Sequence, residues 1–368
     1  MNITVIGIGR LGICVALSYE KAGHNVLGID ISENYIKLIN EKKLVSYEPN
    51  VMEYLKNSKN FRASTSIEEG LEFSDVIFIM IDTPNNGGDN FYDHSNLSTF
   101  LMTINDFKVQ NKHIVICCTI MPTYINKIGK FLLNDCKNTT LNYNPEFIAQ
   151  GDIIQGLENP DLILIGEVTK ESGDIIEKIN LSACNNKPIV CRMSPLEAEI
   201  TKIGLNGYIT MKISYANMIG DAAKILGANG KVILNAIGSD SRIGKKYLNP
   251  GYSFGGPCFP RDTLALSQSL RNIDIKPIMT DASGDYNKYH TQLQVNELLE
   301  QDLDVYSFED VCYKPNCHIP LIEESAKLVI AKNLVKKGKK VIIRDFVQVI
   351  NEVKKEYGNI FSYEIIKN

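Results

Sequence analysis

The sequence lacks an excess of charge of either sign. Its 39 Lys and Arg residues nearly balance 43 Asp and Glu residues, for a formal charge of −4 over 368 residues, and the two signs are mixed along the chain. Proteins that bind nucleic acid or anionic membranes ordinarily carry a basic patch. We therefore expect neither nucleic acid nor a membrane surface as a partner.

Long apolar runs and paired cysteines are also missing. No apolar run reaches the roughly 20 residues of a membrane-spanning helix, and the chain enters a core strand at once, without the layout of a secretory signal. The nine cysteines show no paired spacing of the kind that binds a metal ion, so we expect no metal site. Their scattered positions indicate reduced thiols, and we expect a cytoplasmic protein.

A glycine-rich turn follows the first predicted strand. Residues 2–6 (NITVI) are apolar, residues 7–12 read GIGRLG, and a helical apolar pattern comes next. Gly7 permits a tight turn, Gly9 lets the backbone approach a pyrophosphate, and Gly12 allows the helix to pack closely on the strand. The helix N-terminus would then point at the phosphates of a dinucleotide.

A second predicted strand, over residues 25–30, ends in an acid. Asp30 stands at the distance from the glycines expected of the carboxylate that binds a ribose 2′-hydroxyl. Because that carboxylate would repel the 2′-phosphate of NADP, the pattern predicts NAD as the cofactor. The alternative is a glycine turn in a domain that binds no nucleotide, with Asp30 merely ending a strand.

Strand and helix patterns alternate up to about residue 185. This alternation predicts a mostly parallel sheet with helices on both faces, and such sheets bind ligands at the carboxyl ends of their strands. The loops at 82–84 and 119–122 lie at those ends. The strands are predicted at 76–81, 113–118, 140–143 and 161–165. The residues predicted to contact NAD are Gly7, Gly9, Arg10, Leu11, Gly12, Asp30, Thr83, Pro84 and Thr119.

The pattern changes after this region. A long helix is predicted from Pro195 to about Leu226, and a helix and a strand at 323–337 and 340–344 begin another α/β unit. Shorter helices are predicted at 231–238, 261–270 and 285–300. We expect an α/β protein with three domains: an N-terminal Rossmann-type doubly wound sheet over 1–190, a central helical domain with the long helix over 191–300, and a shortened C-terminal α/β domain over 301–368.

Polar residues with catalytic potential occur in the long helix and after a predicted strand. Lys202 and Asn206 are four residues apart, so they share one helix face and could stabilise an alkoxide or an oxyanion. The alternative for this pair is a solvated helix face. Glu146 follows the strand at 140–143 and could position or activate water; the alternative is an acid that caps a turn.

One cysteine stands apart from the others. Cys258 lies in FGGPCFPRD (residues 254–262), between glycines and Arg261. Nearby positive charge favours the thiolate, which is the nucleophilic form. The alternative is an inert loop cysteine.

Together these segments resemble the UDP-glucose/GDP-mannose dehydrogenase family, the nucleotide-sugar dehydrogenases. The resemblance spans almost the whole chain. It rests on five motifs in the family's order: GIGRLG, NPEFIAQG with NPDLILIG, AEITKIGLNGYITMKISYAN, SDSRIGKKYLNPGYSFGGPCFPRD, and YKPN at 313–316. It implies a four-electron oxidation of the C6 alcohol of a nucleotide sugar to a carboxylate, with two NAD and a covalent thioester.

The resemblance also implies roles for single residues. Cys258 matches the nucleophile that attacks the intermediate aldehyde, while Lys202 and Asn206 match the residues that stabilise oxyanions. Lys202 could also aid deprotonation of the alcohol.

Three further residues match positions that handle water. Asp262 and Thr119 match the pair that orders a catalytic water near the reacting carbon. Glu146 matches the carboxylate that assists hydrolysis of the thioester, which is the task of a general base.

Substrate contacts follow from the same resemblance. Arg242 matches an arginine that reaches a neighbouring subunit's site, and the long helix matches the family's dimer spine, so we expect a homodimer or a higher homo-oligomer. The residues that match substrate contacts are Phe147, Ile148, Lys202, Asn206, Arg242, Tyr247, Phe254, Gly255 and Lys314.

The chain departs from the family pattern at several places. Gln150 replaces a common glutamate, Glu323 replaces an arginine before Glu-Ser, Asp310 replaces a glycine, and the C-terminal domain looks shortened. The NPEF form favours UDP-glucose as the substrate and UDP-glucuronate as the product. The alternatives are the same reaction on GDP-mannose or on a UDP-N-acetylhexosamine, and a non-catalytic NAD-binding subunit.

Overall fold

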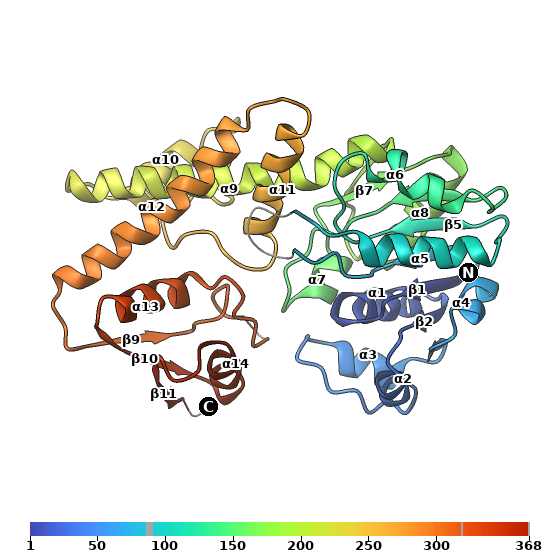
Figure 1. The fold of residues 1–368 in the computed structure, drawn as a ribbon, viewed down its shortest axis with the longest axis horizontal. Coiled ribbons are helices and arrows are strands. Elements are labelled where there is room, and N and C mark those ends of the chain that lie inside the picture. Colours follow the sequence, from blue (N-terminus) through green and yellow to red (C-terminus); the bar gives the residue numbers. More distant parts are fainter. Residues whose placement is uncertain (86–90, 318, 367–368) are drawn as a thin grey trace. The chain divides into compact units, whose positions relative to one another are not determined.

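The computed structural model describes residues 1–85, 91–317 and 319–366. The chain divides into two compact units, Met1–Lys202 and Ile203–Asn368 (Figure 1). The boundary falls inside one continuous helix, α9 (Pro195–Ile225). The three domains expected from the sequence stay a prediction.

The first unit is built on an eight-stranded sheet. Its strand order is β3-β2-β1-β4-β5-β6-β7-β8, and every neighbouring pair is parallel except β6 and β7. The predicted mostly parallel, doubly wound sheet is therefore confirmed. The strands are β1 (Asn2–Ile6), β2 (Asn25–Ile29), β3 (Phe61–Ser64), β4 (Val76–Ile79), β5 (His113–Ile116), β6 (Thr140–Tyr143), β7 (Leu162–Gly166) and β8 (Ile189–Met193).

Helices cover both faces of this sheet, because each face carries its own apolar cluster. On one face Leu17 and Ile176 pack with Val5, and on the other Leu101 and Ile125 pack with Ile77. Central strands that are buried on both sides are apolar throughout, as β4 (VIFI) is. The helices are α1 (Arg10–Lys21), α2 (Glu33–Asn40), α3 (Val51–Asn57), α4 (Ile67–Phe73), α5 (Ser95–Asp106), α6 (Tyr124–Lys127), α7 (Ile153–Glu158) and α8 (Lys170–Ala183), with a 3-10 helix at Gly129–Leu133.

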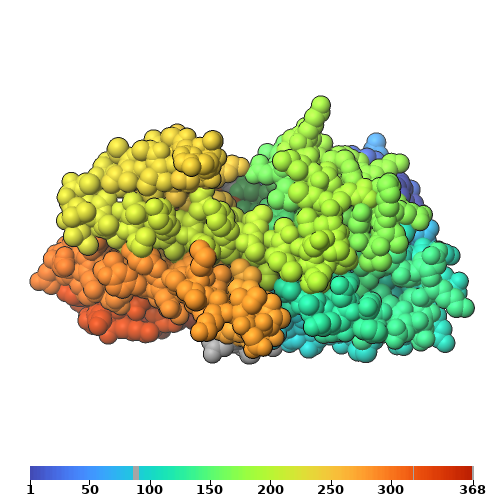
Figure 2. Space-filling view, turned by 90° about the horizontal axis from the view of Figure 1, so that it is seen from above, coloured from blue at the N-terminus to red at the C-terminus, as the bar shows by residue number. Residues whose placement is uncertain are grey.

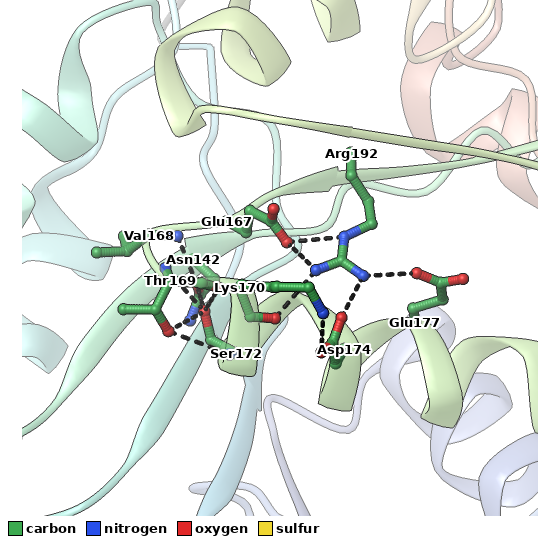
Figure 3. A network of polar contacts seen from close by, with 9 residues as sticks. All are labelled: Asn142, Glu167, Val168, Thr169, Lys170, Ser172, Asp174, Glu177 and Arg192. Carbon is green, nitrogen blue, oxygen red and sulfur yellow. Dashed lines mark hydrogen bonds and ion pairs between the residues drawn. The ribbon is translucent and has the colours of Figure 1, made fainter.

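The last strand of the sheet, β8, is attached by a polar network as well as by its ladder (Figure 3). Arg192 on β8 lies among three carboxylates: its Nε is 2.8 Å from Glu167, and its Nη1 is 2.6 Å from Asp174 and 2.9 Å from Glu177. The residues of β8 are half-buried or exposed. The sequence analysis missed this strand because it shows neither a continuous apolar run nor a clear alternation.

Four helices make up the middle of the chain. The long helix predicted from Pro195 to about Leu226 is confirmed as α9, and the three shorter predicted helices are present with shifted ends. The predicted 285–300 helix begins seven residues earlier, at Ile278. These three helices are α10 (Gly230–Gly238), α11 (Phe259–Arg271) and α12 (Ile278–Glu300).

The C-terminal segment forms a three-stranded parallel sheet with two helices. Its order is β11-β10-β9, and it has its own apolar cluster, which includes Leu328, Ile343 and Val353. The predicted helix at 323–337 begins only at Ala326, because the Ser325 side chain caps it by accepting from the Leu328 N–H. The last helix and strand were not predicted. The elements are β9 (Val305–Glu309), α13 (Ala326–Lys336), β10 (Lys340–Asp345), α14 (Val347–Tyr357) and β11 (Ser362–Ile365).

Within residues 1–85, 91–317 and 319–366, no helix is long and apolar enough to cross a membrane. In the same ranges, no group of three or more His, Cys, Asp or Glu side chains is arranged to hold a metal ion.

Candidate active site

In the glycine turn between β1 and α1, two glycines are required by the fold itself, and a third leaves space for a ligand. Gly7 has a φ of +80°, and a Cβ atom on Gly12 would lie 2.1 Å from the Gly7 carbonyl oxygen. The fold itself therefore requires glycine at these two positions. A Cβ atom on Gly9, the N-cap residue of α1, would meet nothing within 4 Å. The space beside Gly9 fits a pyrophosphate that must approach the backbone closely.

The other residues predicted to contact NAD lie at the same edge of the sheet. Asp30 directly follows β2, and its carboxylate accepts a hydrogen bond from the Ser32 N–H at 3.1 Å. Thr83 follows β4 and donates its hydroxyl to the carbonyl oxygen of Thr119, which follows β5, at 2.8 Å. Carboxyl ends of parallel strands are where dinucleotides bind in such sheets. The described residues thus provide a site that fits NAD.

The non-glycine residues Arg10 and Leu11 of this turn make different contacts. Leu11 packs against the apolar cluster beneath α1. Arg10 is exposed, and its Nη1 donates to the amide oxygen of Gln150 at 2.6 Å. Because Gln150 is neutral, this bond leaves the guanidinium charge of Arg10 uncancelled, whereas a glutamate here would pair with it.

Glu146 lines a small, partly enclosed cavity of the first unit. The cavity measures about 20 Å³ and is also lined by Ser18, Tyr19 and Asn180. Burial raises the pKa of Glu146 to about 7, and the positive charge of Lys202 opposes that shift. A carboxylate with a pKa near neutrality suits a general base better than an ordinary exposed glutamate does.

Lys202 is held against the segment that follows β6. Its ammonium donates to the Glu146 carbonyl oxygen at 2.8 Å and lies 4.6 Å from the centre of the Phe147 ring. Lys202 is 7% exposed and Asn206 is 8% exposed. The alternative of a solvated helix face is therefore wrong for this pair. Ile148 packs toward the core, where it meets Gly156 of α7.

In the second unit, three predicted site residues are linked at the start of α11: Cys258, Asp262 and Asn206. Cys258 is the N-cap residue of α11, and its carbonyl oxygen accepts the Asp262 N–H at 2.8 Å. The buried Asp262 carboxylate accepts a hydrogen bond from the Asn206 side chain. Among the nine cysteines, all of them in described residues, Cys258 is the exposed one.

The predicted strand at 113–118 ends at Ile116, so Cys117 and Cys118 follow β5 rather than lie in it.

The charge of Arg261 is shared with an acid. Arg261, three residues after Cys258, forms an ion pair with Glu323. Glu323 is the residue that replaces the arginine of the family pattern, so this departure places a carboxylate, rather than a second cation, near the start of α11.

The glycines before the thiol are required by packing. A Cβ atom on Gly255 would lie 2.0 Å from the Glu324 carbonyl oxygen, and one on Gly256 would lie 2.5 Å from the Tyr313 ring. Gly256 also has a φ of +81°. The ammonium of Lys314 lies 5.8 Å from the centre of the same Tyr313 ring. The loop that carries Cys258 therefore rests on the segment that contains Lys314.

The remaining predicted substrate contacts are exposed or half-buried. Tyr247 has a φ of +61°, a strained value for a bulky residue, and its ring meets the edge of Phe259 at 6.1 Å. The Arg242 side chain is 86% exposed and pairs with Asp240. The Phe254 N–H and carbonyl are both bonded to the Asn287 side chain. The sequence analysis missed Asn287, because a side chain that binds a distant backbone leaves no pattern in the sequence.

Comparison with known proteins identifies the family. Residues 1–182 match the NAD-binding domain of the UDP-glucose/GDP-mannose dehydrogenase family, and residues 196–289 match its central domain. The UDP-glucose 6-dehydrogenase of Rickettsia bellii is 30% identical over 347 residues, which are 92% of this chain and 79% of that protein. The chain belongs to this family. It is an NAD-dependent nucleotide-sugar 6-dehydrogenase, and NAD is its cofactor.

Other relatives differ in the sugar that they are named for. The GDP-mannose 6-dehydrogenase of Pseudomonas aeruginosa is 27% identical over 360 residues, which are 94% of this chain and 81% of that protein. A UDP-glucose dehydrogenase structure from Pyrobaculum islandicum superposes with a TM-score of 0.90 at 24% identity, over 100% of this chain and 86% of that one. At this identity the superposition shows the shared fold.

The contrast between Gly9 and Gly12 gives a testable prediction. We expect Gly9→Ala to leave the thermal unfolding midpoint almost unchanged, because its Cβ meets no protein atom, and to weaken NAD binding by about tenfold or more, because a pyrophosphate must pass close to this backbone. Isothermal titration calorimetry measures the affinity. Gly284→Ala is the matched control, since its Cβ also meets nothing within 4 Å and it lies outside the cofactor turn. Wild-type NAD affinity in Gly9→Ala would remove Gly9 from the cofactor site.

Proposed function

We propose that this dehydrogenase oxidises the C6 alcohol of UDP-glucose to the carboxylate of UDP-glucuronate, through a thioester on Cys258. The observation that carries the proposal is the exposed thiol at the N-terminus of α11, beside a buried Asp262 that is bonded to Asn206. The name of the Rickettsia relative and the NPEF form of residues 144–147 support UDP-glucose. GDP-mannose and UDP-N-acetylhexosamines remain the alternatives within the same reaction.

The proposed first stage makes an aldehyde. The C6 hydroxyl loses its proton and C6 loses a hydride to NAD, which serves as the hydride acceptor. Lys202 and Asn206 stabilise the negative charge on oxygen, because a buried ammonium and a buried amide are strong donors where water is scarce. Thr119 and Asp262 order the nearby water.

The proposed second stage takes place on sulfur. The Cys258 thiolate adds to the aldehyde carbon and forms the anion of a thiohemiacetal, which passes a second hydride from C6 to a second NAD and so becomes a thioester. The positive end of α11 favours the anionic form of a thiol at its first turn. Water then attacks the thioester carbonyl, the C–S bond breaks, and the carboxylate leaves Cys258 as a thiol. In this step Glu146 accepts the proton of the attacking water.

A non-catalytic NAD-binding subunit is the alternative from another class. It would have no use for an exposed thiol whose neighbours Asp262 and Asn206 are buried and bonded to each other. Burial of unneeded polar groups costs stability, which disfavours this alternative. Because the scheme depends on a reduced thiol, we also propose a cytoplasmic location.

A panel of sugars tests the proposed substrate. We expect two NADH per UDP-glucose at saturating NAD, and much slower reaction with UDP-galactose, UDP-N-acetylglucosamine, UDP-N-acetylmannosamine and GDP-mannose, measured by absorbance and by product mass. We expect Cys258→Ser to lose uronate formation while it keeps NAD affinity, because the thiol handles only the aldehyde stage.

Two results would contradict parts of this proposal. Two NADH per molecule from a different sugar would replace UDP-glucose and keep the chemistry. Uronate formation at the wild-type rate by Cys258→Ser would remove the thioester.

The raised pKa of Glu146 predicts that the rate of thioester hydrolysis depends on pH. Since its pKa is raised to about 7, the base is mostly protonated at about pH 6 and mostly ionised at about pH 8, so the hydrolysis rate should rise roughly tenfold over that interval. We expect Glu146→Gln to slow hydrolysis by about 10²-fold or more and to accumulate the acyl-enzyme, detected as added mass on Cys258. The exposed Glu72→Gln is the control. A pH-independent hydrolysis rate in the wild type would argue against Glu146 as the base.

We further propose a homodimer that forms through α9. In the second unit this helix exposes an apolar stripe at intervals of three and seven residues, a spacing that keeps the side chains on one face. In Figure 2, α9 and α10 form part of the surface in yellow-green and yellow. The exposed side chains are Tyr208, Tyr215, Met218 and Ile225.

The oligomer is open to direct measurement. We expect sedimentation equilibrium to give twice the 41.2 kDa chain mass and Tyr215→Glu to give the monomer, because a charge in an apolar interface is costly. A wild-type monomer at micromolar concentration would overturn this proposal. The exposed Tyr289→Glu, on α12, is the control.

A further inference from the structure

The stretch that leads to Cys258 has no regular structure of its own. Residues 251–255, here called the thiol loop, belong to no helix or strand. Backbone N–H and carbonyl groups that find no partner in a helix or sheet need partners elsewhere, since leaving them unbonded is costly. In the second unit, side chains of α9 and α12 supply these partners.

Asn287 on α12 bonds both backbone groups of one loop residue. Its amide oxygen accepts the Phe254 N–H at 2.8 Å, and its amide nitrogen donates to the Phe254 carbonyl oxygen at 2.9 Å. The amide therefore acts as a neighbouring strand would, with one donor and one acceptor in register. Phe254 lies four residues before Cys258.

Asn217 on α9 repeats this contact from a second helix. Its amide oxygen accepts the Gly251 N–H at 2.9 Å, and its amide nitrogen donates to the Tyr252 carbonyl oxygen at 3.2 Å. Ser253 is also tied to α12, where its hydroxyl donates to the Asn287 carbonyl oxygen at 2.9 Å and lies 2.6 Å from the Thr291 hydroxyl.

His290 adds a side-chain contact to the loop. Its Nδ1 lies 2.8 Å from the Asp221 carboxylate and its Nε2 lies 2.8 Å from the Gly251 carbonyl oxygen. The ring is buried, and Tyr286 donates to the same Asp221 carboxylate at 2.7 Å. The buried His290 ring therefore links Asp221 to the backbone of the thiol loop.

We propose that Asn287 is a positioning residue for Cys258: its paired hydrogen bonds to Phe254 fix the thiol loop and thereby hold the sulfur at the first turn of α11. The inference rests on the proposed role of Cys258. Nucleophilic attack depends on geometry at the scale of an ångström, so a loosened loop should lower kcat much more than it raises the KM for NAD.

The variant Asn287→Asp has a signature that a general loss of stability does not have. An ionised aspartate can accept the Phe254 N–H but turns a second acceptor toward the Phe254 carbonyl. A protonated aspartic acid restores the donor and with it the pattern of the native amide. The ordinary pKa of aspartic acid is about 4, and an opposed carbonyl favours its protonated form. Asn287→Asp should therefore recover activity as the pH falls, whereas Asn287→Ala should not.

The experiment compares the kcat of four enzymes between about pH 5 and pH 8: wild type, Asn287→Asp, Asn287→Ala and the control Asn296→Asp. Asn296 is exposed on the same helix, and its amide oxygen accepts a hydrogen bond from the Gln292 side chain at 2.8 Å. At about pH 8 we expect Asn287→Asp to lose on the order of 10²-fold in kcat, with KM for NAD within about twofold. Its activity relative to wild type should rise at least about tenfold toward pH 5, while the relative activities of Asn287→Ala and Asn296→Asp stay level.

Alkylation of Cys258 gives a readout that needs no sugar. Iodoacetamide is the probe, and the modified peptide is quantified by mass spectrometry. If the loop holds the sulfur at the N-terminus of α11, the pH of half-maximal alkylation should move upward in Asn287→Asp and stay in place in Asn296→Asp. If no sugar is oxidised but this shift occurs, the proposed substrate chemistry fails and the positioning role stands.

Two outcomes would overturn the positioning role. One is an Asn287→Asp enzyme with wild-type kcat at about pH 8 and an unshifted alkylation profile. The other is equal loss in Asn287→Asp and Asn287→Ala at every pH, because that pattern reports only lost stability. If Asn287→Asp does not fold, as judged by NAD binding and thermal unfolding, Asn217→Asp makes the same test from α9.

Discussion

The backbone groups left over where helices and strands end are the constraint on which the candidate sites depend. Several of the proposed site residues lie at or just beyond such ends, Thr119 and Glu146 after strands and Cys258 at the N-cap of α11, where the chain cannot satisfy its own N–H and carbonyl groups. Polar side chains from distant elements take over that task. Buried Glu199 of α9 accepts the N–H groups of Thr123 and Ile125, and Glu48 accepts the N–H of Gly151. Asn287 does the same for the thiol loop.

Some of the polar side chains that lie at these ends are carboxylates, and their burial changes their pKa values. Burial raises the pKa values of Glu146 and Glu199 to about 7, although the two carboxylates serve different ends. Glu199 bonds two backbone N–H groups, which partly oppose its shift, and it stabilises the turn after β5. Glu146 shares its surroundings with Lys202 and is the better candidate for proton transfer. A raised pKa alone therefore does not identify a catalytic group, and the hydrogen-bond partners decide between the two roles.

The structure shows which contacts are made by the residues that depart from the family pattern. Gln150 bonds Arg10 without neutralising it, so the cofactor turn keeps a positive charge. Glu323 pairs with Arg261 near the thiol. The C-terminal segment forms a three-stranded sheet with its own apolar core. These substitutions alter the charge around both sets of site residues.

The sequence by itself determined six of the eight strands of the first unit's sheet, the glycine turn, the long helix and the exposed cysteine, because apolar periodicity and glycine spacing are local properties of the chain. It did not reveal strand β3, strand β8, which is held by its ladder to β7 and by Arg192, or the last helix and strand. Only the tertiary structure decided that Lys202 and Asn206 are buried rather than solvated, and that Asn217, Asn287 and His290 hold the thiol loop. These facts depend on contacts between residues tens of positions apart, and no local pattern encodes which distant backbone a side chain will meet.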